Sequence, residues 1–194
     1  YPGEEGGTAL ADVLFGDYNP AGRLPVTFYR STEDLPPFED YRMAGRTYRY
    51  FQGEPLYPFG YGLSYTRFEY SRLRISPETV SALEDVTVSV DVRNAGRRVG
   101  DEVVQLYVRD VAASLPVPVR ELQGFTRIRL GPGEKRTVTF TLTARQLAMV
   151  DARGRRVIEP GGFAVSVGGG QPGGPDCVPM LTKAFRVVGE TMEL

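Results

Sequence analysis

Residues 67 to about 188 alternate hydrophobic and polar positions with the two-residue period of β-strands. In the clearest stretch, Val86, Val88, Val90 and Val92 alternate with polar residues, so one face of this strand is expected in the core and the other in solvent. The same pattern predicts further strands at 68–75, 104–108, 122–130, 138–142, 163–167 and 185–187. About seven short strands over roughly 120 residues, separated by Gly, Pro and Asn turns, predict a mainly β fold, a two-sheet sandwich of the immunoglobulin or fibronectin III type.

Two shorter features interrupt this pattern. Residues 143–147 are expected to form a short helical turn. The Gly-rich stretch 168–174 is expected to be a mobile loop, because it lacks the Lys-Ser/Thr and the following helix of a phosphate-binding loop.

The first 28 residues have the pattern of one helix followed by one strand. Apolar residues recur at helical spacing at Ala9, Leu10, Val13 and Leu14. Glu4 and Glu5 lie where the helix would begin, and Gly16 is a helix stop. Alternation then predicts a strand at 24–28. One helix and one strand cannot bury a core, so they are expected to be the last elements of an α/β domain that begins upstream.

Residues 29–66 break regular structure with prolines and glycines, yet aromatic residues are concentrated there. A flexible linker would not be so aromatic, so we expect an ordered strap packed between two domains. Arg46, Tyr48, Arg49 and Tyr50 are candidates for this docking, near the mouth of an active site. The alternative is that the tyrosines stack on sugar rings.

Composition excludes several functions. The chain has no histidine, which removes Ser-His-Asp and Cys-His arrangements and most zinc sites. A net charge of -1 argues against nucleic acid as a partner, and no stretch approaches the roughly 20 apolar residues of a membrane helix. The single cysteine, Cys177, cannot form an intrachain disulfide and is expected to be an inert thiol. A chain without a disulfide is compatible with compartments on either side of a membrane, so the cysteine count does not indicate the compartment.

Carboxylate pairs are the remaining option for hydrolysis. A retaining glycosidase needs two carboxyl groups about 5 Å apart, but side chains of adjacent residues on a strand point to opposite faces. The adjacent pairs are Glu4-Glu5, Glu33-Asp34, Glu39-Asp40, Glu84-Asp85 and Asp101-Glu102. We expect none of them to be catalytic. Glu4 and Glu5 either supply charge at a helix N-terminus or border an active site that lies elsewhere.

The chain resembles glycoside hydrolase family 3 in three long motifs: Tyr-Pro-Gly-Glu-Glu-Gly-Gly at 1–7, Ala-Asp-Val-Leu-Phe-Gly-Asp-Tyr-Asn-Pro-Ala-Gly-Arg-Leu-Pro-Val-Thr-Phe at 11–28 and Tyr-Pro-Phe-Gly-Tyr-Gly-Leu-Ser-Tyr at 57–65. Its β-rich part resembles the fibronectin III-like tail of that family in three more: Gly-Asp-Glu-Val-Val-Gln-Leu-Tyr-Val at 100–108, Pro-Val-Arg-Glu-Leu-Gln-Gly-Phe at 118–125 and Glu-Pro-Gly-Gly-Phe at 159–163. The resemblance covers nearly the whole chain.

The resemblance implies a domain order. A barrel with an aspartate nucleophile comes first, an α/β sandwich with the glutamate acid/base follows, and the fibronectin III-like domain comes last. Residues 1–28 would end the α/β sandwich, 29–66 would be the ordered interdomain linker, and 67–188 would be the fibronectin III-like domain. Neither catalytic residue can then be assigned to this chain, and the chain alone is expected to be inactive. The chain starts at Tyr1 without a leader sequence, which we interpret as a fragment or a processed protein.

The implied activity of the parent is two-step retaining hydrolysis from the non-reducing end of a β-linked oligosaccharide, without a cofactor. The partners of the chain would be the upstream catalytic domains, with no nucleic acid and no membrane. Gly-Arg-Thr-Tyr-Arg-Tyr-Phe at 45–51 resembles the β-xylosidase branch more than the β-glucosidase branch. The alternative is a free-standing carbohydrate- or protein-binding module.

Overall fold

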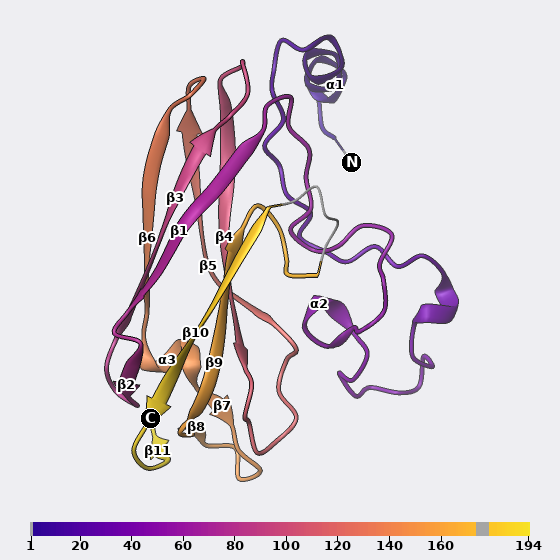
Figure 1. Ribbon diagram of the computed structural model, residues 1–194. Coiled ribbons are helices and arrows are strands. Elements are labelled where there is room, and N and C mark those ends of the chain that lie inside the picture. The colour runs from indigo at the N-terminus through magenta and orange to yellow at the C-terminus, as the bar shows by residue number, and fades with distance from the viewer. Residues whose placement is uncertain (1, 174–178) are drawn as a thin grey trace.

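The computed structural model describes residues 2–173 and 179–194, and its main body is a two-sheet β-sandwich (Figure 1). One sheet has the strand order β1-β3-β6 and the other β2-β10-β9-β4-β5. The first sheet contains β1 Phe68–Ser76, β3 Val86–Asn94 and β6 Lys135–Leu142. The second contains β2 Thr79–Ser81, β4 Gly100–Asp110, β5 Glu121–Leu130, β9 Gly161–Gly168 and β10 Met180–Val188. All neighbours are antiparallel except β2 and β10. The expected mainly β sandwich and its seven strands are confirmed.

The core lies between the two sheets and is built from the alternating apolar positions. On β3, Val86, Val88, Val90 and Val92 are at most 1% exposed. They face the inner residues of β4 and β9, and Phe163 stacks on Phe185 with ring centroids 5.4 Å apart. Burying one such side chain contributes about 1.5–3 kcal/mol, so the alternation alone stabilises this part of the chain strongly.

Several short elements complete the sandwich. The expected helical turn is confirmed as α3 Ala144–Leu147, which places Leu147 in the core. A small third sheet has the order β11-β8-β7 and joins β7 Met149–Val150, β8 Arg156–Ile158 and β11 Met192–Glu193. Strands of two or three residues are too short to show a period, which is why the sequence pattern does not predict them.

The N-terminal region, residues 2–66, lies beside the sandwich and contains the helices α1 Gly6–Phe15, η1 Thr32–Asp34 and α2 Thr47–Tyr50 (Figure 1). Gly16 ends α1 in the left-handed conformation with φ 86°, as its position predicts. Among the residues that the structure describes, no helix is long and apolar enough to cross a membrane.

The expected strand at 24–28 is wrong. These residues form only a single bridge, between Phe28 and Tyr57, with flanking hydrogen bonds between Leu24 and residues 60 and 61. The backbone nitrogen of Leu24 donates to the carbonyl of Tyr61 at 2.8 Å. Pro25 has no N–H to continue the ladder, so the two segments lie side by side without forming a sheet.

The expectation of a mobile loop at 168–174 is also wrong for its first half. Residues 168–171 are buried, and the carbonyl of Gly169 accepts hydrogen bonds from Arg23 and Gln105. This turn is therefore held against the N-terminal region. Residue 174 and Cys177 lie outside the described residues, so the inert thiol stays a prediction.

Candidate docking interface between the N-terminal region and the sandwich

Tyr48 is the aromatic contact between α2 and the sandwich. Its ring stacks on Phe59 with centroids 4.0 Å apart and an interplanar angle of 13°, and meets Tyr107 of β4 edge-on at 6.2 Å. The backbone N–H of Leu122 on β5 donates to the Tyr48 hydroxyl at 3.2 Å. Tyr48 therefore packs inside the chain, and its stacked face is already covered by Phe59.

The neighbours of Tyr48 have different partners. The Arg49 guanidinium lies 2.7 Å from the Glu121 carboxylate, and the carbonyl of Arg49 accepts from Val119 at 2.7 Å. Arg46 does not reach the sandwich, because its guanidinium donates to the carbonyls of Pro37, Asp40 and Arg42 within the strap. Tyr50 lines a cavity of about 320 Å³ at the junction. Two of the four candidate docking residues, Tyr48 and Arg49, thus bond to the sandwich directly.

A buried ion pair forms the centre of the interface. Arg23 Nη2 lies 2.8 Å from Glu102 Oε2, and the two side chains are only 11% and 4% exposed. The Tyr70 hydroxyl donates to the other carboxylate oxygen at 2.6 Å, and Arg23 Nε donates to the Gly169 carbonyl at 3.2 Å. The charge of Glu102 is therefore compensated by one group from the N-terminal region and one from the opposite sheet.

Burial nevertheless raises the pKa of the Glu102 carboxyl above its usual range. The Arg23 charge and the hydrogen bond from Tyr70 act in the opposite direction and limit the rise. Burial also raises the pKa of the Tyr70 hydroxyl, with the Glu102 charge adding to the effect. The Arg23 charge therefore favours the ionised form of Glu102, against the effect of burial.

A second buried network is built on Gln105 of β4. Its amide nitrogen donates to the carbonyls of Gly60 and Gly169, both at 3.0 Å, while its amide oxygen accepts from the Tyr107 hydroxyl at 2.6 Å. Gln105 is 2% exposed. One side chain thus bonds the strap, the β4 strand and the turn after β9, and each of these polar groups is satisfied without water.

Two glycines let the strap approach this closely. Gly60 has φ 77°, and a Cβ there would lie 2.2 Å from the Gln105 amide oxygen. A Cβ on Gly62 would lie 2.2 Å from the backbone oxygen of Gly22 and 2.7 Å from an Arg23 nitrogen. The motif at 57–65 therefore carries glycines because side chains there would displace both buried networks.

A third set of hydrogen bonds joins Asn19, which follows α1, to the sandwich and to the end of the strap. Asn19 donates to the carbonyl of Val99 at 3.1 Å and accepts from the Ser64 hydroxyl and the Tyr65 N–H at 3.0 and 2.8 Å. The Tyr65 hydroxyl donates to the carbonyl of Val13 at 2.6 Å, which fixes the end of α1. The helix is thus attached at its C-terminal end.

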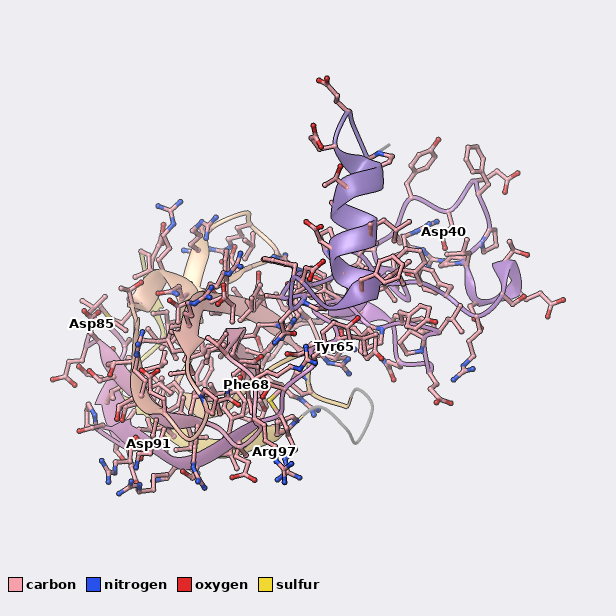
Figure 2. All side chains as sticks on the ribbon, turned by 90° about the horizontal axis from the view of Figure 1, so that it is seen from above. Asp40, Tyr65, Phe68, Asp85, Asp91 and Arg97 are labelled. Atoms are coloured by element: carbon pink, nitrogen blue, oxygen red, sulfur yellow. The ribbon has the colours of Figure 1, made fainter. Side chains whose placement is uncertain are left out.

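The N-terminal region also exposes large apolar side chains. Figure 2 shows α1 and the loop that carries Asp40 standing away from the sandwich, on which Phe68, Asp85 and Asp91 lie. The most exposed apolar residues of this surface, which we name the outer apolar surface, are Leu10, Leu14, Phe15, Phe38 and Tyr41, with 61–88% of their area exposed. Large apolar side chains exposed at several positions of one region are candidates for an interaction surface.

The adjacent carboxylates serve local structure. Asp34 and Glu84 accept backbone N–H groups in turns, and Asp40 pairs with Arg42 at 2.7 Å. Asp101 pairs with Arg127, whereas Glu102 faces Arg23. Glu4 and Glu5 are exposed at the N-terminal end of α1. Among the described residues, no group of His, Cys, Asp and Glu side chains is arranged to hold a metal ion.

Sequence reasoning missed Arg23, Glu102 and Gln105. Glu102 gives a detectable signal, because it occupies the core-facing position of β4 that Val104 and Leu106 continue. A charged residue at such a position requires a buried partner. Nothing in the spacing of the sequence identifies Arg23 as that partner, since it lies 79 residues away.

This geometry defines a class of protein: a fibronectin III-like sandwich joined through a buried polar interface to an accessory segment with an exposed apolar surface. Residues 1–65 match the glycosyl hydrolase family 3 C-terminal domain, and residues 102–171 match the fibronectin type III-like domain. The chain belongs to glycoside hydrolase family 3 and corresponds to the C-terminal part of its β-glycosidases.

The relatives include enzymes named for two substrates. The chain is 44% identical over 180 residues to a periplasmic β-glucosidase from Salmonella typhimurium and 46% identical over 169 residues to a xylan 1,4-β-xylosidase from Xylanibacter ruminicola. Each alignment covers 87% of this chain but only 24% and 19% of the two relatives. The structure superposes on β-glucosidase 3B from Thermotoga neapolitana, solved with α-D-glucose, with a TM-score of 0.84, 36% identity and coverage of 98% of this chain and 27% of that one.

Replacing Tyr48 with alanine tests the aromatic contact of this interface. We expect Tyr48→Ala to lower the free energy of unfolding by about 2–4 kcal/mol, because it removes the stack on Phe59 and the edge contact with Tyr107. Thermal unfolding of this chain measures the effect. Tyr48→Phe keeps both ring contacts and loses only the hydroxyl that accepts from Leu122, so its loss should be about 1 kcal/mol. An unchanged melting temperature for Tyr48→Ala would exclude the packing role.

Proposed function

We propose that this chain is the non-catalytic C-terminal part of an exo-acting retaining β-glycosidase, in which it docks onto and stabilises the upstream catalytic domains. The outer apolar surface is the observation that carries this proposal. Its side chains are exposed, whereas Arg23 and Gly60 of the same region bond to the sandwich, so the N-terminal region is anchored to the sandwich and also presents apolar area to solvent. A free-standing binding module would leave that area in water.

The same contacts support the proposed division of the chain. Residues 1–28 would complete an α/β sandwich domain, 29–66 would be the ordered linker, and 67–188 would form the fibronectin III-like domain. The buried bonds from Arg23 to Glu102 and from Gln105 to Gly60 support a fixed linker rather than a flexible tether, because they bond both N-terminal segments to the same strand.

For the substrate of the parent we propose a β-xyloside in preference to a β-glucoside. The motif at 45–51 supports this choice, and the 46% identity to a xylan 1,4-β-xylosidase is compatible with it. The 44% identity to a β-glucosidase makes β-glucoside the alternative. The ratio of kcat/KM for 4-nitrophenyl β-xyloside and β-glucoside, measured on the full-length parent, discriminates between them.

The isolated chain is expected to hydrolyse neither aryl glycoside, because its adjacent carboxylates are engaged in turns and ion pairs or exposed at the surface. Release of 4-nitrophenol by the purified chain, compared with the full-length parent at equal concentration, measures this. Turnover that persisted in a Glu4→Gln/Glu5→Gln variant of the chain would contradict the non-catalytic role.

Glu4 and Glu5 are proposed to border the active site of the parent, since they are exposed at the free end of α1. Glu4→Gln and Glu5→Gln in the full-length enzyme should then raise KM and leave the melting temperature unchanged. Unchanged kinetics in both variants would leave these residues with the role of helix N-terminal charge.

A further inference from the structure

A cavity of about 210 Å³ with both polar and apolar lining residues lies on the outer face of the five-stranded sheet, away from the core. Its floor is formed by Tyr107, Ser166 and Thr182, which lie in register across β4, β9 and β10. The hydroxyls of Ser166 and Thr182 are 2.8 Å apart and bond to each other. Arg109 and Arg120 form its walls. The cavity therefore brings two arginines together with hydroxyl groups, and apolar residues such as Val119 and Pro172 complete its lining.

The two arginines lack a counter-charge in the described part of the chain. No Asp or Glu lines the cavity, and neither arginine belongs to an ion pair among residues 2–173 and 179–194. Burial lowers the pKa of the Arg120 guanidinium, and the nearby Arg109 charge lowers it further. A partly buried cation without a partner is costly, so an oxyanion in the cavity would be bound favourably.

We propose that this cavity binds the carboxylate of a uronic acid residue of a saccharide. Planar guanidinium groups match carboxylate oxygens with paired hydrogen bonds, and the hydroxyls of the floor can bond to sugar hydroxyls. Pockets that enclose drug-sized ligands have volumes of about 300–1,000 Å³. The smaller volume of this cavity limits the ligand to about one sugar ring. The proposal rests on the proposed role of the parent in saccharide hydrolysis, and it places a second saccharide contact on the fibronectin III-like domain.

Titration of the chain with sodium glucuronate, followed by calorimetry, tests the proposal, with glucose and sodium sulfate as parallel ligands. We expect glucuronate to bind and Arg120→Met to weaken binding by about tenfold or more, since it removes a charge-assisted contact. Arg120→Lys keeps the charge without the planar fork and should weaken binding less. Arg136→Met removes the same charge from the other sheet and should leave binding unchanged.

Each contrary result has a defined meaning. Absence of glucuronate binding to a folded chain, or equal binding by Arg120→Met, would overturn the site. Sulfate or glucose binding as tightly as glucuronate would overturn the carboxylate assignment. Hydrolysis of neutral aryl glycosides by the parent is measured separately, so failure of this site and failure of the proposed function are distinguishable.

Discussion

Arg23→Met should lower the free energy of unfolding of this chain by about 3–5 kcal/mol, because it leaves the buried Glu102 carboxylate without its cationic partner. Methionine keeps much of the volume of the arginine stem, so the loss reports charge rather than a cavity. The hydrogen bond from Arg23 to the Gly169 carbonyl is lost as well. Urea denaturation at neutral pH, followed by circular dichroism, measures the difference.

The pH dependence separates this charge effect from lost packing. Burial holds the pKa of Glu102 above its usual range, and removal of Arg23 raises it further. A carboxyl with a raised folded-state pKa binds its proton more readily in the folded than in the unfolded protein. Its contribution to stability is therefore fully present below the unfolded-state pKa and is lost as the pH rises through the folded-state pKa. The deficit of Arg23→Met should be largest at neutral pH and shrink at about pH 4, where the carboxyl is protonated.

The double variant Arg23→Met/Glu102→Gln is the matched control. With both charges removed, no uncompensated ion remains, so its stability should lie well above that of Arg23→Met. A double variant as unstable as Arg23→Met, together with a deficit that does not change with pH, would mean that Arg23 stabilises the interface by packing alone.

The sandwich could be predicted from the sequence because its strands are long enough to display their period. The alternating valines of β3 predict both the strand and its buried face, and the seven strands expected within residues 67–188 lie where the pattern places them. The segment 24–28 has the same alternation but forms no strand, because pairing depends on a neighbour that the local pattern does not specify. Alternation predicts which face is apolar and does not predict what covers it.

The interface could be predicted only in part. Aromatic concentration indicates a packed strap, and Tyr48 indeed contacts the sandwich. The decisive contacts join residues far apart in the chain: Arg23 with Glu102, and Gly60 with Gln105. Hydrophobic periodicity relates residues that are a few positions apart in the chain. It contains no signal for a contact between residues that are dozens of positions apart. The long family motifs contain all four residues, but only the structure shows that they bond to one another.

Gly62→Ala should destabilise the chain by about 3 kcal/mol, because the added methyl group has no room between two backbone segments. A Cβ at this position would lie 2.2 Å from the backbone oxygen of Gly22, which cannot rotate away as a side chain could. It would also lie 2.7 Å from an Arg23 nitrogen, so relief of the clash displaces Arg23 from Glu102. Part of the loss should then disappear in a background that already carries Arg23→Met.

Gly22→Ala provides the matched comparison on the other side of the same contact. A Cβ on Gly22 meets nothing within 4 Å, and neither glycine requires a positive φ. Gly22→Ala should therefore leave the stability almost unchanged or raise it slightly by restricting the unfolded chain. The difference in urea midpoint between the two alanine variants isolates the close approach of residues 22 and 62 from the general cost of replacing a glycine. Equal midpoints would show that the strap can move away from the sandwich without loss, and the fixed linker would then be wrong.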